Sequence, residues 1–128
     1  MLNQLRDEVH KNAIEHGWWE KEREFGTLVA LMHSELSEAL EEWRNGRKPD
    51  EVYFSCTSSK NIYDGVHCGE ECDLCTGGKP EGIPIELADC IIRILDYCGA
   101  KGIDIEEAIQ IKHEYNKNRP YRHGGKQV

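Results

Sequence analysis

Apolar residues recur every three or four positions in two long stretches of the chain, which is the pattern of amphipathic helices. The first stretch runs from Leu28 to Arg44 without glycine or proline, and Thr27 offers an N-cap. Glu35 falls at the margin of its apolar face, where a desolvated carboxylate needs a partner. We therefore expect a cation of the chain or a bound metal ion opposite Glu35. The apolar face itself consists of Leu28, Met32, Leu36, Ala39, Leu40 and Trp43.

The second stretch, from Ile83 to Cys98, predicts a helix whose apolar and acidic sides are separate. Glu86, Asp89 and Arg93 share the acidic side, one turn apart, and Cys90 lies near it. The pattern leaves the burial of Cys90 open and makes Cys98 a small core residue. The apolar side consists of Leu87, Ala88, Ile91, Ile92, Ile94, Leu95 and Cys98.

Each of these helices carries two acids at i and i+3, Glu35 with Glu38 and Glu86 with Asp89. Such acids are common on a solvated helix face. Two antiparallel helices, however, can direct four carboxylates at one point, because residues three apart lie on the same face. Hard oxygen ligands of this kind suit Mg²⁺ or Mn²⁺ rather than zinc.

Two further helices complete an all-α domain of four to five helices that spans residues 1–128. One runs from Leu2 to His16 and stops at Gly17. The other follows the N-cap Asp104, with Glu107 at the capping-box position, and reaches about Asn118. The tail 119–126 is basic, so it is either a solvated segment or a source of ligands for an anionic substrate.

Residues 49–82 form a long connection without regular helix between the second and third main helices. Cys72-x-x-Cys75 is half of a zinc site, and Cys56 and Cys68 can complete a tetrahedral set. A structural Zn²⁺ site and free thiols in a variable loop both remain open.

Two adjacent tryptophans, Trp18 and Trp19, follow the first helix. They either cover an edge of the core or offer a flat wall on which a nucleobase can stack. His10 is open to the same choice between a surface histidine and a base contact.

Composition narrows the classes of function. The chain has 24 acidic against 16 basic residues, which argues against non-specific binding to a nucleic acid polymer. No apolar run approaches the roughly 18 residues of a membrane span, and the N-terminus lacks the apolar core of a signal peptide. We expect a cytoplasmic protein whose six cysteines are reduced thiols or metal ligands.

The motif Glu35-x-x-Glu38 followed by Glu86-x-x-Asp89 resembles the signature of the MazG-like all-α nucleoside triphosphate pyrophosphohydrolases. The segments His33–Trp43 and Lys112–Lys126 are also similar to that family. The connection between the two motifs is longer here than is usual in the family, and the cysteine-containing loop accounts for the difference.

The resemblance implies a MazG-like bundle, a homodimer or dimer of dimers, that hydrolyses a (deoxy)nucleoside triphosphate to the monophosphate and pyrophosphate, as in nucleotide-pool cleaning. Few partners for Ile91, Ile92 and Leu95 within so small a domain also favour a second copy. The four acids would hold Mg²⁺ or Mn²⁺, with a carboxylate such as Glu38 orienting the attacking water. The implied substrate-binding residues are His10, Trp19, Trp43, Arg93, Lys112, Asn116, Arg119 and Lys126.

Four points stay open. Arg93 would contact the substrate or pair with the acids, and Trp43 is an alternative to Trp19 for base stacking. A non-catalytic nucleotide- or zinc-binding interaction module and a phosphoribosyl-ATP pyrophosphohydrolase are the alternative functions. The preferred base and sugar are not specified by the sequence.

Overall fold

The computed structural model describes residues 1–56, 62–63 and 78–128. The chain is mostly helical, with α1 (Leu2–Glu15), α2 (Phe25–Arg44), α3 (Ile83–Lys101), α4 (Ile105–Lys117) and the short α5 (Arg122–Gly125). It divides into two compact units, Glu22–Ile94 and Met1–Lys21 with Leu95–Val128, so that α3 begins in the first and ends in the second. None of the described helices combines the length and apolar character that a membrane span needs.

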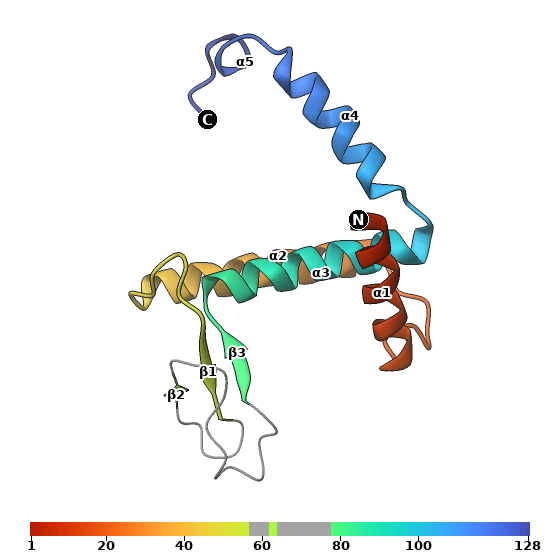
Figure 1. The fold of residues 1–128 in the computed structure, drawn as a ribbon, viewed down its shortest axis with the longest axis vertical. Coiled ribbons are helices and arrows are strands. Elements are labelled where there is room, and N and C mark those ends of the chain that lie inside the picture. Colours follow the sequence, from red (N-terminus) through yellow and green to blue (C-terminus); the bar gives the residue numbers. More distant parts are fainter. Residues whose placement is uncertain (57–61, 64–77) are drawn as a thin grey trace. The chain divides into compact units, whose positions relative to one another are not determined.

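The unit Glu22–Ile94 contains two long helices that lie side by side, α2 and the first part of α3 (Figure 1). Arg93 donates a hydrogen bond to Glu35, whereas Glu38, one turn further along α2, is bonded to Glu86, which lies earlier on α3. These two pairs run in opposite order, so the helices are antiparallel, as the sequence predicted.

A small antiparallel sheet follows α2, in the order β2 (Ile62–Tyr63), β1 (Tyr53–Ser55), β3 (Lys79–Glu81). The register of β1 and β3 pairs Tyr53 with Glu81 and Ser55 with Lys79. The prediction of a connection without helix is correct for the described residues of 49–82, but the sheet was not predicted. Strands of two or three residues carry too little alternation to be recognised from sequence.

The sheet is tied to the end of α2 by a buried tyrosine. The Tyr53 hydroxyl donates to both carboxylate oxygens of Glu42, at 2.8 and 2.9 Å. Burial and the adjacent Glu42 raise the pKa of Tyr53 to about 12, so it stays a neutral donor. The guanidinium of Arg47 lies 3.7 Å from the centre of the Tyr53 ring and pairs with Glu51 at 2.5 Å.

The unit Met1–Lys21 with Leu95–Val128 joins α1 to α4 and to the end of α3. Asp104 caps α4 as predicted, accepting from the Glu107 N–H at 3.0 Å. Asn3 donates to Asp104 at 2.9 Å and Arg6 donates to the Ile103 carbonyl at 2.7 Å, which fixes α1 against the α3–α4 turn. Gly17, at φ +85°, ends α1 as predicted.

Two helix boundaries differ from the prediction. The helix expected to start after Thr27 begins at Phe25. The Leu28 N–H donates to the Glu24 carbonyl, so Glu24 is the N-cap and Thr27 lies inside the helix. The helix expected to end near Cys98 continues to Lys101. Gly99 lies inside it because α1 packs there: a Cβ on Gly99 would meet the His10 Cβ at 2.5 Å.

In the part of α3 before Leu95, the buried face is the acidic one. Glu86 and Cys90 are buried, whereas Leu87, Ile91 and Ile92 are exposed. Cys98 is buried, as predicted, and so is Leu95, which therefore does not belong with the exposed Ile91 and Ile92 as the sequence had suggested.

Gly82 is the residue at the β3–α3 junction that tolerates substitution least. It has φ +122°, and a Cβ there would lie 2.3 Å from the Glu51 carbonyl oxygen. Gly82→Ala should therefore lower the free energy of unfolding by about 3 kcal/mol, measured by urea denaturation. Gly46→Ala is the control: Gly46 also has positive φ but open space around it, so the expected loss is about 1 kcal/mol. Equal losses would show that the contact with Glu51 has no effect.

Candidate functional site

The acidic residues of α2 and α3 meet between the two helices. Glu35 and Glu86 are the two charged residues that the described part of the chain buries, with 7% and 9% of the whole-residue surface exposed. Carboxylate oxygens of Glu35, Glu86 and Asp89 all lie within 4.8 Å of one another. Glu38 is joined to this group through its hydrogen bond with Glu86. The four predicted acids are thus at one place, although Glu38 is exposed at its edge.

Crowding makes the ionisation of Glu86 and Asp89 costly. Burial, the hydrogen bond with Glu38 and the neighbouring carboxylates raise the pKa of Glu86 to about 7. Burial and the charge of Glu35 also raise the pKa of Asp89, against the opposing effect of Arg93 and Lys79. Near neutral pH, Glu86 therefore holds a proton part of the time and can donate it to Glu38.

Arg93 lies opposite Glu35, so a cation of the chain fills the position for which the sequence left a cation or a metal ion open. Its Nε donates to Glu35 Oε1 at 2.7 Å, and both residues belong to the same compact unit. Of the two roles left open for Arg93, pairing with the acids is therefore the one that this structure contains.

The donor set fits a hard divalent cation. Three carboxylates supply oxygen only, without the sulfur or imidazole ligands that zinc favours. Ligands around one octahedral Mg²⁺ are roughly 3 to 4 Å apart, so oxygens within 4.8 Å need only a small rotamer adjustment. The raised pKa values of Glu86 and Asp89 also indicate that added positive charge would stabilise the site.

A second group of polar side chains forms around Asp96, in the unit that contains α1. Asp96 Oδ1 lies 2.8 Å from His10 Nδ1, and the Trp19 indole N–H donates to the same carboxylate at 2.9 Å. The two rings meet edge to face at 5.4 Å between centroids. His10 and Trp19 are thus brought together by Asp96, which the sequence analysis missed, and their contact with a base stays a prediction.

The only signal in the sequence that points to Asp96 is its position on the helix that carries Asp89. It follows Asp89 by seven residues, two turns along the same helix, and it belongs to neither motif. Its partners His10 and Trp19 lie near the other end of the chain, so no local pattern links them.

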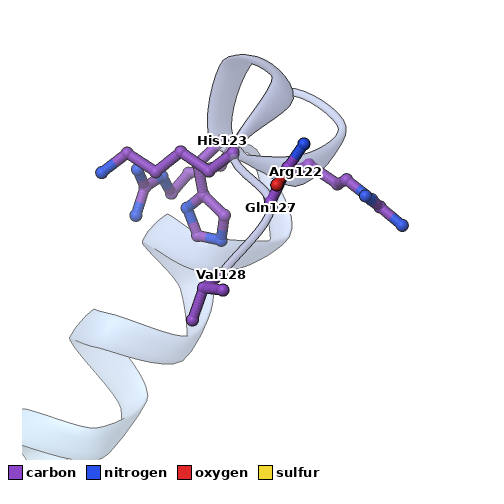
Figure 2. Close-up of a pocket in the computed structure, with 6 residues that line it drawn as sticks. Arg122, His123, Gln127 and Val128 are labelled. Atoms are coloured by element: carbon purple, nitrogen blue, oxygen red, sulfur yellow. The ribbon is translucent and has the colours of Figure 1, made fainter.

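The late helix and tail bring several basic residues together. Lys112 and Arg119 lie over the Tyr115 ring, at 4.8 and 5.5 Å from its centre. Figure 2 shows a pocket of about 510 Å³ near the C-terminus whose lining is mainly basic and includes two predicted residues. Its lining consists of Arg119, Arg122, His123, Lys126, Gln127 and Val128. Arrays of this kind suit anions.

Two predicted substrate-binding residues are not brought into any of these three groups. Asn116, on α4, and Trp43, near the end of α2, are exposed. Of the predicted zinc ligands, Cys56 is buried at the end of β1, and Cys68, Cys72 and Cys75 lie outside the described residues.

Comparisons of this chain with known protein families, with curated proteins and with solved structures find no match.

The pKa of Glu86 predicts how stability depends on pH. Its folded value of about 7 exceeds its ordinary value of 4.5, so the folded state binds the extra proton between these values. Stability should therefore fall as pH rises from 5 to 7 and level off above 7, with Glu86 contributing about 2 kcal/mol. The free energy of urea unfolding, measured in EDTA across this range, checks the sign.

Glu86→Gln tests this contribution directly, since it should remove the Glu86 share of the pH dependence. Glu41→Gln makes the same change on the exposed side of α2 and should leave the profile as in the wild type. A Glu86→Gln profile that matches the wild type would show that Glu86 is ionised throughout.

Proposed function

We propose that this protein is a Mg²⁺- or Mn²⁺-dependent hydrolase that cleaves nucleoside triphosphates to the monophosphate and pyrophosphate. The observation that carries the proposal is the meeting of Glu35, Glu86 and Asp89 within 4.8 Å, with Glu38 bonded at their edge. Two i, i+3 acid pairs on antiparallel helices are also the feature through which the sequence resembles MazG-like pyrophosphohydrolases.

The burial of each acid suggests its role, either as a metal ligand or as the group that orients the attacking water. Glu35, Glu86 and Asp89 would hold the metal, which would neutralise phosphate charge and lower the pKa of a bound water. Glu86 would give up its shared proton on becoming a ligand. Glu38 is exposed and reaches the group through one hydrogen bond, so it is the carboxylate best suited to orient the attacking water.

The assignment of substrate contacts rests on the resemblance together with the chemistry of the side chains. Trp19 and His10, held by Asp96, offer an aromatic corner for a nucleobase. Lys112, Arg119 and Lys126 supply positive charge for phosphate oxygens, with Asn116 as a further polar contact.

Phosphorus-31 NMR of a panel of canonical and modified triphosphates, with Mg²⁺ and with EDTA, tests the reaction. We expect metal-dependent appearance of monophosphate and pyrophosphate, and water labelled with oxygen-18 would show which phosphorus is attacked. Diphosphate and orthophosphate would move the cleavage position. Absence of turnover on every substrate would contradict the proposal and favour a binding module.

Asp89→Asn and Glu38→Gln should each lower kcat by roughly 100-fold or more, because each removes a charge that acts on the metal or the water. Steady-state pyrophosphate release measures the effect, and circular dichroism confirms that the fold is retained. Glu41→Gln, on the exposed side of α2, should stay within about twofold of the wild type. Undiminished turnover in both site variants would remove the basis of the assignment.

We also propose that the protein is at least a homodimer. Leu36, Leu40 and Trp43 form a stripe at i, i+4 and i+7 on α2, and all three are exposed. On α3 the exposed Leu87, Ile91 and Ile94 repeat the same spacing. Two adjacent helices with parallel apolar stripes match the way one helix pair packs on a second in a four-helix bundle.

Ile91→Lys should weaken the dimer at least roughly tenfold, because a buried lysine at the centre of the stripe lacks a partner. Sedimentation velocity over a micromolar concentration series measures this. Ile111→Lys, on the exposed surface of α4, is the matched control and should not change the association. A wild-type protein that stays monomeric over the whole series would contradict the proposal.

A further inference from the structure

Arg93 and Glu35 form an ion pair in which the two partners are buried to different extents. Arg93 Nε donates to Glu35 Oε1 at 2.7 Å. The Glu35 side chain is 9% exposed and the Arg93 side chain 37% exposed. The carboxylate therefore depends on this contact for its charge balance, whereas the guanidinium already reaches water.

The pair is also part of the carboxylate group itself. Glu35 supplies one of the three oxygens that lie within 4.8 Å of one another, and Asp89 lies one turn before Arg93 on α3. Arg93 and, more weakly, Lys79 lower the pKa of Asp89, against the larger effects that raise it. Arg93 thus supplies positive charge to two of the acids that would bind a metal.

A divalent cation and the Arg93 guanidinium compete for the negative charge of Glu35 and Asp89. An ion bound by Glu35, Glu86 and Asp89 would lie a few ångströms from Arg93, and like charges at that distance repel strongly in a partly buried site. An ion with two charges can take over from Arg93 the charge balance of Glu35. The guanidinium can leave at low cost, because more than a third of its side chain is already exposed.

We propose that Arg93 is a displaceable counter-ion: it stabilises the buried Glu35 in the metal-free protein and is released from Glu35 when the divalent metal binds. This rests on the proposed metal site and adds a residue that regulates it. Arg93 then lowers the affinity for metal, in contrast to a side chain that supports a metal ligand and raises it.

Titration with Mn²⁺, followed by the electron paramagnetic resonance signal of the free ion, tests the proposal without any turnover. At about pH 8, Arg93→Gln should bind Mn²⁺ about tenfold more tightly than the wild type, since a charged hydrogen bond no longer has to be broken. Arg44→Gln is the matched control. Its guanidinium lies at the exposed end of α2 with a 3.8 Å contact to Glu41, so its affinity should stay within about twofold.

Arg93→Lys is a second variant, which keeps the proposal testable if Arg93→Gln does not fold. It keeps the charge but lacks the guanidinium Nε, so its affinity should lie between those of the wild type and Arg93→Gln. Circular dichroism of the three variants without metal shows whether each retains its helices. If Arg93→Gln is unfolded without metal, the proposal is tested by the Mn²⁺ affinities of the wild type and Arg93→Lys, of which Arg93→Lys should bind more tightly.

The release itself can be observed on the wild type. The Arg93 Nε–H resonance in nitrogen-15 NMR, assigned by its absence in Arg93→Lys, should be slow to exchange without metal and exchange rapidly when Mg²⁺ saturates the site. Unchanged protection, or weaker Mn²⁺ binding in Arg93→Gln, would overturn the inference and make Arg93 a support for Glu35. Absence of any Mn²⁺ binding to the wild type would instead remove the proposed metal site as well.

Discussion

Negative charge enclosed between α2 and α3 is the constraint on which this part of the molecule depends. Glu35 and Glu86 are buried beside Asp89, and ionised carboxylates so placed destabilise a fold unless positive charge or protons reach them. Two devices supply that balance. Arg93 pairs with Glu35, and Glu86 keeps a proton up to about pH 7. Both devices are reversible, because one is a partly exposed arginine and the other a titrating acid, so neither blocks the entry of a cation.

Burial of the acids between α2 and α3 leaves apolar residues exposed on the outer side of the helix pair. Glu86 and Ile91 lie on different sides of α3, so a helix that buries the first leaves the second in water. The same holds for α2, where Glu35 is buried and Leu36 and Leu40 are exposed. A single chain therefore cannot bury its acidic cluster and its apolar stripes at once. The proposed second copy resolves a conflict that the proposed metal site creates.

The sequence predicted the helices well and their buried faces poorly. Periodicity located all four long helices, and the cap at Asp104 and the stop at Gly17 were correct because each depends on a few adjacent residues. Periodicity cannot, however, show which of two faces is buried when a second chain or a bound ion can cover either. Asp96 escaped notice for a different reason, since its contacts with His10 and Trp19 join distant parts of the sequence.

The junction after β3 explains how a long connection can separate the two acidic motifs without changing where the acids lie relative to each other. The Gly82 carbonyl accepts from the Glu86 N–H at 3.1 Å, so the start of α3 is fixed only one turn before its first acid. Gly82 is in turn packed against Glu51, and Tyr53 is bonded to Glu42 on α2. Because β1 pairs with β3, the chain returns to the same place whatever length lies between them, and loop closure costs little more as a loop grows. The position of Glu86 opposite Glu38 therefore depends on this junction.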